Sequence, residues 1–303
     1  LNLTKKDKRN STAFLTIQEG CDKFCSFCVV PYTRGAERSR SPEVIIKEAN
    51  ELVNSGVKEI TLLGQNVNAY NGLNEKNKSI DFTSLIKILC KLDDLKRLRF
   101  VTSHPRDMTE NLINLFGQEE KLMPYLHLPI QSGSNQILKK MNRGHTVEYY
   151  LDIISKLKVI RPEIAISGDF IVGFPGETEE DFQQTLEICE TIKYSQAYSF
   201  KYSPRTGTPS FEMKDISEKV KSYRLSKLQE TISIYQREFQ KNLVGTVQDV
   251  LIEKLGKLSD QYIGRTPYMN PVVIESKDNQ IGKILPVKIC ETNGLSLSGE
   301  HVI

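Results

Sequence analysis

Short apolar runs alternate with amphipathic segments over the first 210 residues. The apolar runs are rich in β-branched residues and predict six strands, at 14–18, 57–64, 97–102, 125–129, 166–172 and 197–202. Helix-period patterns fill the intervals, and we expect helices at 42–55, 82–92, 146–160 and 178–192 among them. Strict alternation of strand and helix favours a parallel sheet curled toward a barrel, here a partial (β/α)6 barrel in an α/β fold. Functional groups in such folds lie at the carboxyl ends of the strands.

The pattern changes after residue 215. A long polar helix is expected at 216–243, and five short strand-like runs follow between 246 and 303. Five strands in so short a stretch predict a small closed or Greek-key all-β barrel, similar to an OB fold. We therefore predict two domains: a core over 1–239, with the long helix as connector, and a β domain over 240–303.

Composition narrows the class of protein only slightly. Of the 303 residues, 39% are hydrophobic and 26% are charged, which is ordinary for a globular protein with a real core. No run of about 18 apolar residues is present, so we expect no membrane partner. A net charge of +3 neither supports nor excludes nucleic acid as a partner. The six cysteines favour a reduced, cytoplasmic setting, because three of them fall within eight residues.

The most informative stretch is the cysteine loop, Cys21-Asp-Lys-Phe-Cys25-Ser-Phe-Cys28. Three thiolates on one loop can bind three corners of an iron–sulfur cubane and leave the fourth iron open. Zinc also takes closely spaced cysteines, although no second Cys or His pair follows to complete a closed site. A disulfide would leave one cysteine over. Spacing alone favours the cluster and leaves zinc as an alternative.

The loop follows the first predicted strand, and there it resembles the signature of the radical S-adenosylmethionine enzymes, with Phe27 as its aromatic residue. The resemblance implies a [4Fe–4S] cluster on Cys21, Cys25 and Cys28, whose open iron chelates S-adenosylmethionine. It also implies reductive cleavage of this cofactor to a 5′-deoxyadenosyl radical, which abstracts a hydrogen from the substrate.

Other strand ends match the same family. Gly64-Gln65-Asn66 stands where the family binds the amino group of the cofactor, and here carbonyl acceptors replace the usual carboxylate. Residues 129–133 follow the fourth strand, and residues 168–177 resemble the family's adenine-packing stretch. The resemblance implies cofactor contacts from Phe27, Gly64, Gln65, Asn66, Gln131, Ser132, Asp169, Ile171, Gly173, Pro175 and Gly176. Each segment alone could be an ordinary Gly/Pro turn.

Several further polar residues are weaker candidates. Arg34, Arg38 and Arg40 follow the cysteine loop, and Arg205 lies beyond the sixth strand. They could contact substrate phosphate or cofactor carboxylate, or form a solvated basic turn. We expect structural roles for two histidines and burial for three thiols, namely His104, His127, Cys90, Cys189 and Cys290.

Over nearly the whole chain the sequence resembles the methylthiotransferases, whose last module is a TRAM domain. Residues 63–70 and 99–105 are similar to the branch that adds a methylthio group to C2 of N6-isopentenyladenosine 37 in tRNA. Other possible activities are methylthiolation of another modified tRNA adenosine or of a ribosomal protein. From another class, the alternative is a non-catalytic, zinc-bearing RNA-binding protein.

The resemblance implies a tRNA anticodon stem-loop as substrate, an electron donor such as flavodoxin or ferredoxin, and a monomeric enzyme. Two basic groups could contact phosphates, or could be solvated surface: Lys139, Lys140, Arg143 and His145, and Lys219, Lys221, Arg224 and Lys227. Tyr262 and Tyr268 could stack on bases. The charges of the β domain balance, which argues against assigning it all the binding.

Full-length methylthiotransferases carry an N-terminal domain with three more cysteines for a second [4Fe–4S] cluster that delivers sulfur. The scattered Cys90, Cys189 and Cys290 do not match that arrangement. We therefore expect the chain to be a fragment, competent to cleave the cofactor but not to complete methylthiolation.

Overall fold

Six parallel strands form the core of the protein. The computed structural model describes residues 11–294 and 296–302. The strands are β1 (Thr12–Thr16), β4 (Glu59–Leu63), β7 (Arg97–Phe100), β8 (Tyr125–His127), β9 (Ala165–Val172) and β10 (Gln196–Lys201). They pair in the orders β1-β4-β7 and β8-β9-β10, and a bridge between Leu98 and Leu122 joins the two halves. The prediction of six core strands is confirmed, and β1 and β10 are the two unpaired edges of an open barrel.

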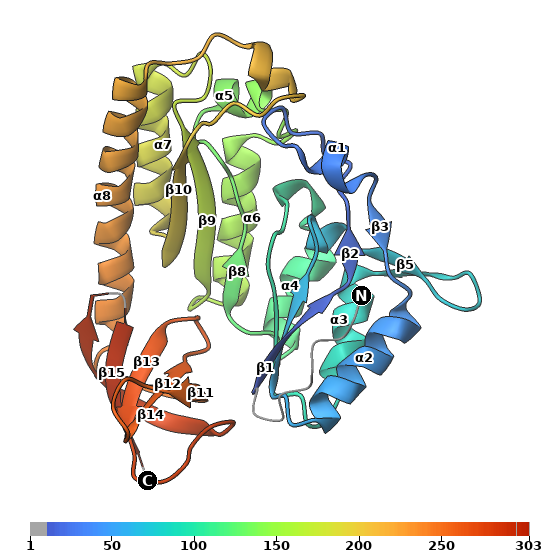
Figure 1. Ribbon diagram of the computed structural model, residues 1–303, viewed down its shortest axis with the longest axis vertical. Helices are drawn as coiled ribbons and strands as arrows, with labels where there is room; N and C mark the ends of the chain where they lie inside the picture. The colour runs from blue at the N-terminus through green and yellow to red at the C-terminus, as the bar shows by residue number, and fades with distance from the viewer. Residues whose placement is uncertain (1–10, 295, 303) are drawn as a thin grey trace.

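Helices cover the outside of this curved sheet (Figure 1). The longer ones are α2 (Pro42–Asn54), α3 (Phe82–Cys90), α4 (Glu110–Gln118), α6 (Val147–Ile160), α7 (Glu179–Ile192) and α8 (Glu218–Leu243), and the shorter ones are α1 (Val30–Arg34) and α5 (Asn135–Lys140). The start of α3 follows from its cap, since the Asp81 carboxylate accepts a hydrogen bond from the Ser84 amide at 2.7 Å. The four helices predicted individually are confirmed, with ends shifted by at most two residues.

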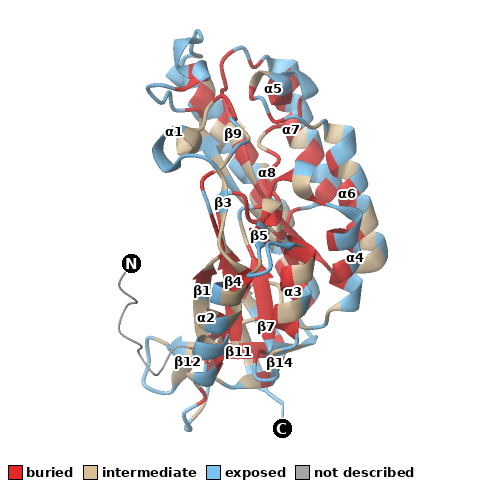
Figure 2. Ribbon diagram, turned by 90° about the vertical axis from the view of Figure 1, so that its right-hand side faces the viewer, coloured by how far each residue is buried: buried red, intermediate tan, exposed pale blue. Residues whose placement is uncertain are grey.

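The apolar core lies between the strands and their helices, not inside the barrel. Leu62, Phe100 and Phe170 alternate outward from their strands and are buried in this layer. Figure 2 shows the buried residues concentrated along β4 and β7. The inward positions carry polar side chains instead, such as Thr61 and His127. A closed eight-stranded barrel fills its interior with apolar layers, whereas this open barrel keeps a polar interior that can receive a ligand.

A second, smaller barrel follows α8. Its strands are β11 (Val247–Leu255), β12 (Gln261–Arg265), β13 (Pro271–Glu275), β14 (Ile284–Asn293) and β15 (Ser296–His301), closed in the order β11-β12-β13-β15-β14. The predicted five-stranded barrel is therefore confirmed. It lies below the amino ends of the core strands, with α8 running down to it along one side of the core (Figure 1). The boundary between residues 239 and 240 stays a prediction, since α8 passes through it without a break.

Strand alternation in the small barrel corrects two expectations. Tyr262 lies inside the barrel among Val250, Ile274 and Leu285, so its ring is not available to stack on a base. Cys290 points the other way, because its neighbour Ile289 faces inward, and its thiol is exposed rather than buried. Within the described residues, no helix has the length and apolar character needed to cross a lipid bilayer.

Candidate functional site

The cysteine loop leaves the sheet at the carboxyl ends of the core strands and is held there by backbone contacts. The Ser26 amide donates to the Met141 carbonyl at 2.9 Å, and the Ser26 hydroxyl donates to the Lys140 carbonyl at 2.8 Å. The Asn142 side chain donates to the Phe24 carbonyl at 2.8 Å. The last residue of α5 and the two residues after it therefore hold the loop in place.

The three thiols of the loop are free, with Cys25 buried and Cys21 and Cys28 half-buried. Burial raises the pKa of Cys21 and of Cys28, and the charge of the neighbouring Cys25 thiolate raises both further. Each thiolate makes ionisation of the neighbouring thiols less favourable. The thiols can all ionise when a bound cationic metal group compensates their negative charge. The donor set therefore fits an iron–sulfur group.

The spacing of possible ligands bears on the kind of metal group. Among residues 11–294 and 296–302, no set of three or more His, Cys, Asp or Glu side chains converges as the ligands of a single metal ion do. A cubane cluster offers a separate iron to each thiolate, so the loop needs no such convergence to hold one.

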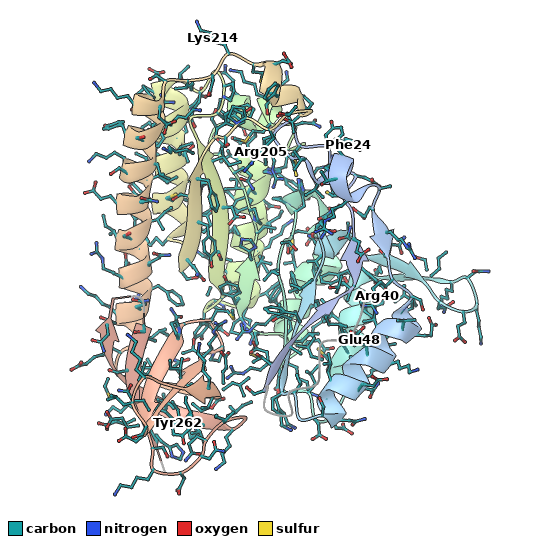
Figure 3. All side chains as sticks on the ribbon, in the orientation of Figure 1. Phe24, Arg40, Glu48, Arg205, Lys214 and Tyr262 are labelled. Atoms are coloured by element: carbon teal, nitrogen blue, oxygen red, sulfur yellow. The ribbon has the colours of Figure 1, made fainter. Side chains whose placement is uncertain are left out.

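A cavity of about 320 Å³ lies beside the loop. It brings together five of the residues singled out from the sequence, which come from the loop and from three strand ends: Phe27, Gln131, Asp169, Ile171 and Arg205. Figure 3 places Arg205 and Phe24 at this upper end of the molecule, whereas Tyr262 lies at the opposite end. We call this cavity the upper pocket.

The segment after β4 approaches the loop with side-chain amides. The Gln65 Oε1 accepts a hydrogen bond from the Gly20 amide at 2.6 Å. Asn66 is buried and donates through Nδ2 to the Asp107 Oδ2 at 2.8 Å, while its own Oδ1 is buried without a partner. An unpartnered buried carbonyl oxygen beside carboxylates, including Glu37, fits a ligand ammonium group. Sequence reasoning missed Glu37 and Asp107, because they lie outside any recognisable motif.

Five other predicted cofactor residues do not line the upper pocket. Ser132 is fully buried, with its Oγ 3.4 Å from the Thr185 Oγ1. The Gly173 amide donates to the Glu177 carboxylate at 2.6 Å, in a turn with positive φ. The others are Gly64, Pro175 and Gly176.

The arginines after the loop do not gather at the upper pocket. Arg34 and Arg38 are exposed to solvent. Arg40 pairs with Glu48 at 2.7 Å and also donates to the Thr16 carbonyl, so it ties the edge strand β1 to α2 (Figure 3). Of the four predicted substrate-binding arginines, Arg205 alone lines the upper pocket.

The two predicted basic groups are broken up by burial. Arg143 is buried, with its Nη1 3.3 Å from the Cys25 Sγ. Lys221 and Arg224 are buried on the inner face of α8, and Arg224 pairs with Glu177 at 2.7 Å. Because they are buried, these three cations are unavailable to phosphates. The sequence could not show this, since a helical pattern of charge does not reveal which face of the helix packs inward.

A larger cavity of about 1160 Å³ extends from the barrel interior, below the upper pocket, to the second barrel, and residues of α2 and α8 also line it. Its walls include Phe14 of β1, His127 of β8 and Tyr198 of β10, and its floor includes Tyr268. The His127 Nε2 lies 3.0 Å from the Asp169 Oδ1, so this pair connects the two cavities. We call the larger cavity the barrel chamber. The sequence already indicates Tyr268 as a stacking candidate. Sequence reasoning missed Phe14 and Tyr198, although the alternation of Tyr198 and Phe200 in the stretch AYSFKY was a usable signal.

Family profiles show to which class of proteins this open barrel with its three-cysteine loop belongs. The Radical SAM superfamily profile matches residues 15–189, and the TRAM domain profile matches residues 241–302. The chain belongs to the radical SAM superfamily, whose members use a [4Fe–4S] cluster and S-adenosylmethionine.

The particular family follows from its relatives, which are named tRNA-2-methylthio-N(6)-dimethylallyladenosine synthases; the chain belongs to the family of these proteins. That of Rickettsia felis is 53% identical over 296 residues, covering 97% of this chain and 66% of the relative. That of Ruegeria sp. (strain TM1040) is 53% identical, covering 98% of this chain and 67% of the relative. The chain thus spans about two thirds of the length of these relatives.

Solved structures agree on the fold. The radical S-adenosylmethionine methyltransferase TsrM from Kitasatospora setae, with cobalamin and a [4Fe–4S] cluster bound, superposes with a TM-score of 0.55 at 17% identity. The match covers 67% of this chain and 39% of that one. Coproporphyrinogen III oxidase (HemN) from Escherichia coli superposes with a TM-score of 0.51 at 15% identity, covering 87% of this chain and 68% of that one. At these identities the likeness concerns the fold alone.

Proposed function

We propose that this chain is the radical-generating core and TRAM domain of a tRNA methylthiotransferase. Its product is the methylthio group at C2 of N6-isopentenyladenosine 37, which is the N6-dimethylallyl nucleoside named in its relatives. The observation that carries the proposal is the set of three free thiols on the loop that borders the upper pocket. The substrate assignment rests on the names of relatives that are 53–54% identical.

The protein's residues have separate tasks in this proposal. Cys21, Cys25 and Cys28 would hold a [4Fe–4S] cluster, and the upper pocket would hold S-adenosylmethionine. When bound, these groups supply the radical that abstracts a hydrogen atom. Asn66 lies outside the lining of the upper pocket, and its unpartnered Oδ1 would be the acceptor for the cofactor's ammonium group. Phe27 and Ile171 line the upper pocket and would pack on the cofactor's apolar parts and exclude water.

Anaerobic reconstitution with iron and sulfide tests the radical chemistry. The reconstituted chain should be brown, absorb broadly near ~400 nm as iron–sulfur proteins do, and release 5′-deoxyadenosine when given a reductant. Replacing any one of Cys21, Cys25 or Cys28 by Ala should abolish cluster binding. The matched control is Cys290→Ala, because that thiol is exposed on the distant TRAM barrel. A colourless protein holding one stoichiometric zinc would contradict the proposal and favour an RNA-binding zinc protein.

Sulfur transfer is tested separately. The three remaining cysteines lie on α3, α7 and β14, two of them buried, and do not form a second cluster site. These 303 residues alone should therefore cleave the cofactor without methylthiolating tRNA, and turnover without any added partner would contradict this. Mass spectrometry of tRNA from cells lacking the gene distinguishes the isopentenyladenosine substrate from another modified adenosine. Unchanged tRNA would favour a ribosomal-protein substrate.

A further inference from the structure

A line of three polar groups runs from the barrel chamber into the upper pocket. Thr102 follows β7, His127 ends β8 and Asp169 lies on β9, so the groups come from three successive core strands. Thr102 and His127 line the barrel chamber, and Asp169 lines the upper pocket. The side chains of His127 and Asp169 are only 12% and 25% exposed, so the hydrogen bond between them is stronger than it would be in water.

The hydrogen bonds along this line have one direction. The Thr102 backbone amide can only donate, and it donates to the His127 Nδ1 at 3.3 Å. The neutral imidazole therefore carries its proton on Nε2, which lies 3.0 Å from the Asp169 Oδ1 and donates to it. The ring cannot rotate or change tautomer without breaking one of the two hydrogen bonds. His127 thus holds one oxygen of the Asp169 carboxylate in a fixed direction.

The first residue of the line has an unusual backbone conformation. Thr102 has a φ of +62°, in the left-handed region that a β-branched residue rarely adopts. Its Oγ1 donates to the Gly64 carbonyl, and its own carbonyl accepts from the Val67 amide at 3.2 Å. These contacts keep the Thr102 amide directed at His127 although the conformation is unfavourable. Backbone strain of this kind clusters at functional sites, where the surrounding structure enforces it.

The last residue of the line is fixed through its backbone as well. The Asp169 carbonyl accepts a hydrogen bond from the Gln131 amide at 2.9 Å, and Gln131 also lines the upper pocket. Among the described residues, His127 is the one hydrogen-bond partner of the Asp169 carboxylate, through Oδ1. The Oδ2 is therefore left to accept hydrogen bonds from a ligand, and hydroxyl groups are suitable donors.

We propose that Thr102 and His127 are positioning residues, which direct the Asp169 carboxylate toward hydroxyl groups of the nucleoside bound in the upper pocket. This inference rests on the proposed function, in which that nucleoside is part of S-adenosylmethionine. Neither Thr102 nor His127 lines the upper pocket, so both act through Asp169. An acceptor that is fixed before the ligand arrives lowers the ordering cost of binding.

The test measures ligand affinity, not turnover. The probes are S-adenosylmethionine and S-adenosylhomocysteine, which share the ribose hydroxyls but differ in the sulfonium charge. Each is titrated by isothermal calorimetry into the anaerobically reconstituted chain. His127→Leu removes the donor to Asp169, and Thr102→Val removes the hydroxyl that anchors the strained backbone. Each variant should bind both ligands about tenfold more weakly, the effect of one hydrogen bond to a charged acceptor.

Conservative variants separate positioning from a merely structural role. His127→Gln keeps an N–H group near the position of the imidazole Nε2, and Thr102→Ser keeps the hydroxyl, so each should retain most of the affinity. Thr191→Val is the matched control, because Thr191 is exposed on α7 and its hydroxyl donates to the Glu187 carbonyl of the same helix. It should change neither affinity. Iron content and the midpoint of thermal unfolding show that each variant keeps its cluster and fold.

The outcomes separate the two proposals. If His127→Leu and Thr102→Val bind both ligands as tightly as the wild-type chain does, the positioning role is wrong and the proposed function stands. The positioning role is also wrong if the Gln and Ser variants bind as weakly as the Leu and Val variants. Weaker binding of S-adenosylmethionine alone would mean that Asp169 faces the sulfonium and would overturn the assignment to hydroxyl groups. If the wild-type chain binds neither ligand, the proposed function itself is contradicted, and the positioning role with it.

Discussion

The guanidinium of Arg143 lies against the buried thiol of the cysteine loop, with its Nη1 3.3 Å from the Cys25 Sγ. Its Nη2 donates to the Pro129 carbonyl at 2.6 Å, which fixes the guanidinium between the fourth strand end and the loop. Arg143 is itself buried, so solvent does not screen its charge. A positive charge in this position stabilises a thiolate, and with it the more negative state of any redox group bound there.

Replacing Arg143 should therefore make the bound cluster harder to reduce. We expect Arg143→Gln to lower the reduction potential by about 60 mV or more, which is a tenfold change in a one-electron equilibrium. Arg143→Lys keeps the charge and should lower it less. Potentiometric titration followed by electron paramagnetic resonance measures the shift. Lys139→Gln, at an exposed cation on α5, is the control and should leave the potential unchanged.

The two domains are joined by buried arginines on β7. Arg97 donates to the carbonyls of Asp249 and Arg265, and Arg99 donates to the Pro267 carbonyl at 2.7 Å. Both guanidinium groups face the buried Glu59, whose Oε2 lies 3.0 Å from the Arg99 Nε. The TRAM barrel is thus attached to the amino ends of the core strands through charge-assisted hydrogen bonds.

Removing one partner of this buried network should be costly. Arg99→Gln leaves Glu59 with less compensation and TRAM carbonyls without a donor, and we expect a loss of about 3–5 kcal/mol in the free energy of unfolding. Arg265→Gln is the matched control, because Arg265 is partly exposed and lies 3.6 Å from Glu253, a pair worth less than about 1 kcal/mol. Urea unfolding measures both. Equal losses in the two variants would rule out a special role for the network.

Two glycines after β9 provide a graded test of backbone shape. Gly173 has a φ of +70°, and a Cβ there would lie 2.4 Å from the Cγ of the buried Lys221. Gly176 has a φ of +76°, but a Cβ there would meet only the flexible end of Lys140. Gly176→Ala should cost about 1–2 kcal/mol from the left-handed backbone alone, and Gly173→Ala should cost more. Thermal unfolding of both variants checks this order, which the motif alone does not predict.

Acid should destabilise the protein through His145. Burial lowers the pKa of His145 to about 4, and the nearby Arg143 charge lowers it further from its ordinary value of 6.5. The unfolded chain therefore takes up this proton at a higher pH than the folded chain does. The free energy of unfolding should fall as the pH is lowered from 6.5 toward 4, and should not depend on this group above that window.

The measurement is urea unfolding of the metal-free chain at several pH values between 4 and 7. In His145→Gln the free energy of unfolding should depend less steeply on pH than in the wild-type chain, even if the substitution lowers stability at every pH. An unchanged slope would mean that His145 takes up its proton equally in the folded and unfolded chain. His104 has its pKa lowered in the same direction by burial, so part of the slope should remain.

The sequence by itself determined the order of elements and the ligand loop. The six core strands, the long helix and the five-stranded barrel follow from local periodicity, because each segment carries its own pattern of inward- and outward-facing residues. The three cysteines were equally readable, since their ligand spacing lies within eight consecutive residues. The convergence of Phe27, Gln131, Asp169 and Ile171 on one pocket followed from the rule that parallel strand ends meet at one edge.

Only the tertiary structure decided which polar and aromatic residues are free to act. Arg143, Lys221 and Arg224 look like surface cations in the sequence, yet packing buries them against Cys25, Asp215 and Glu177. Tyr262 looked available for stacking and is buried, while Tyr198 and Phe200, which the sequence showed only as part of a strand, are exposed. The physical reason is that burial depends on which distant segment covers a face. Here the barrel stays open between β1 and β10, and that gap is set by the sheet as a whole.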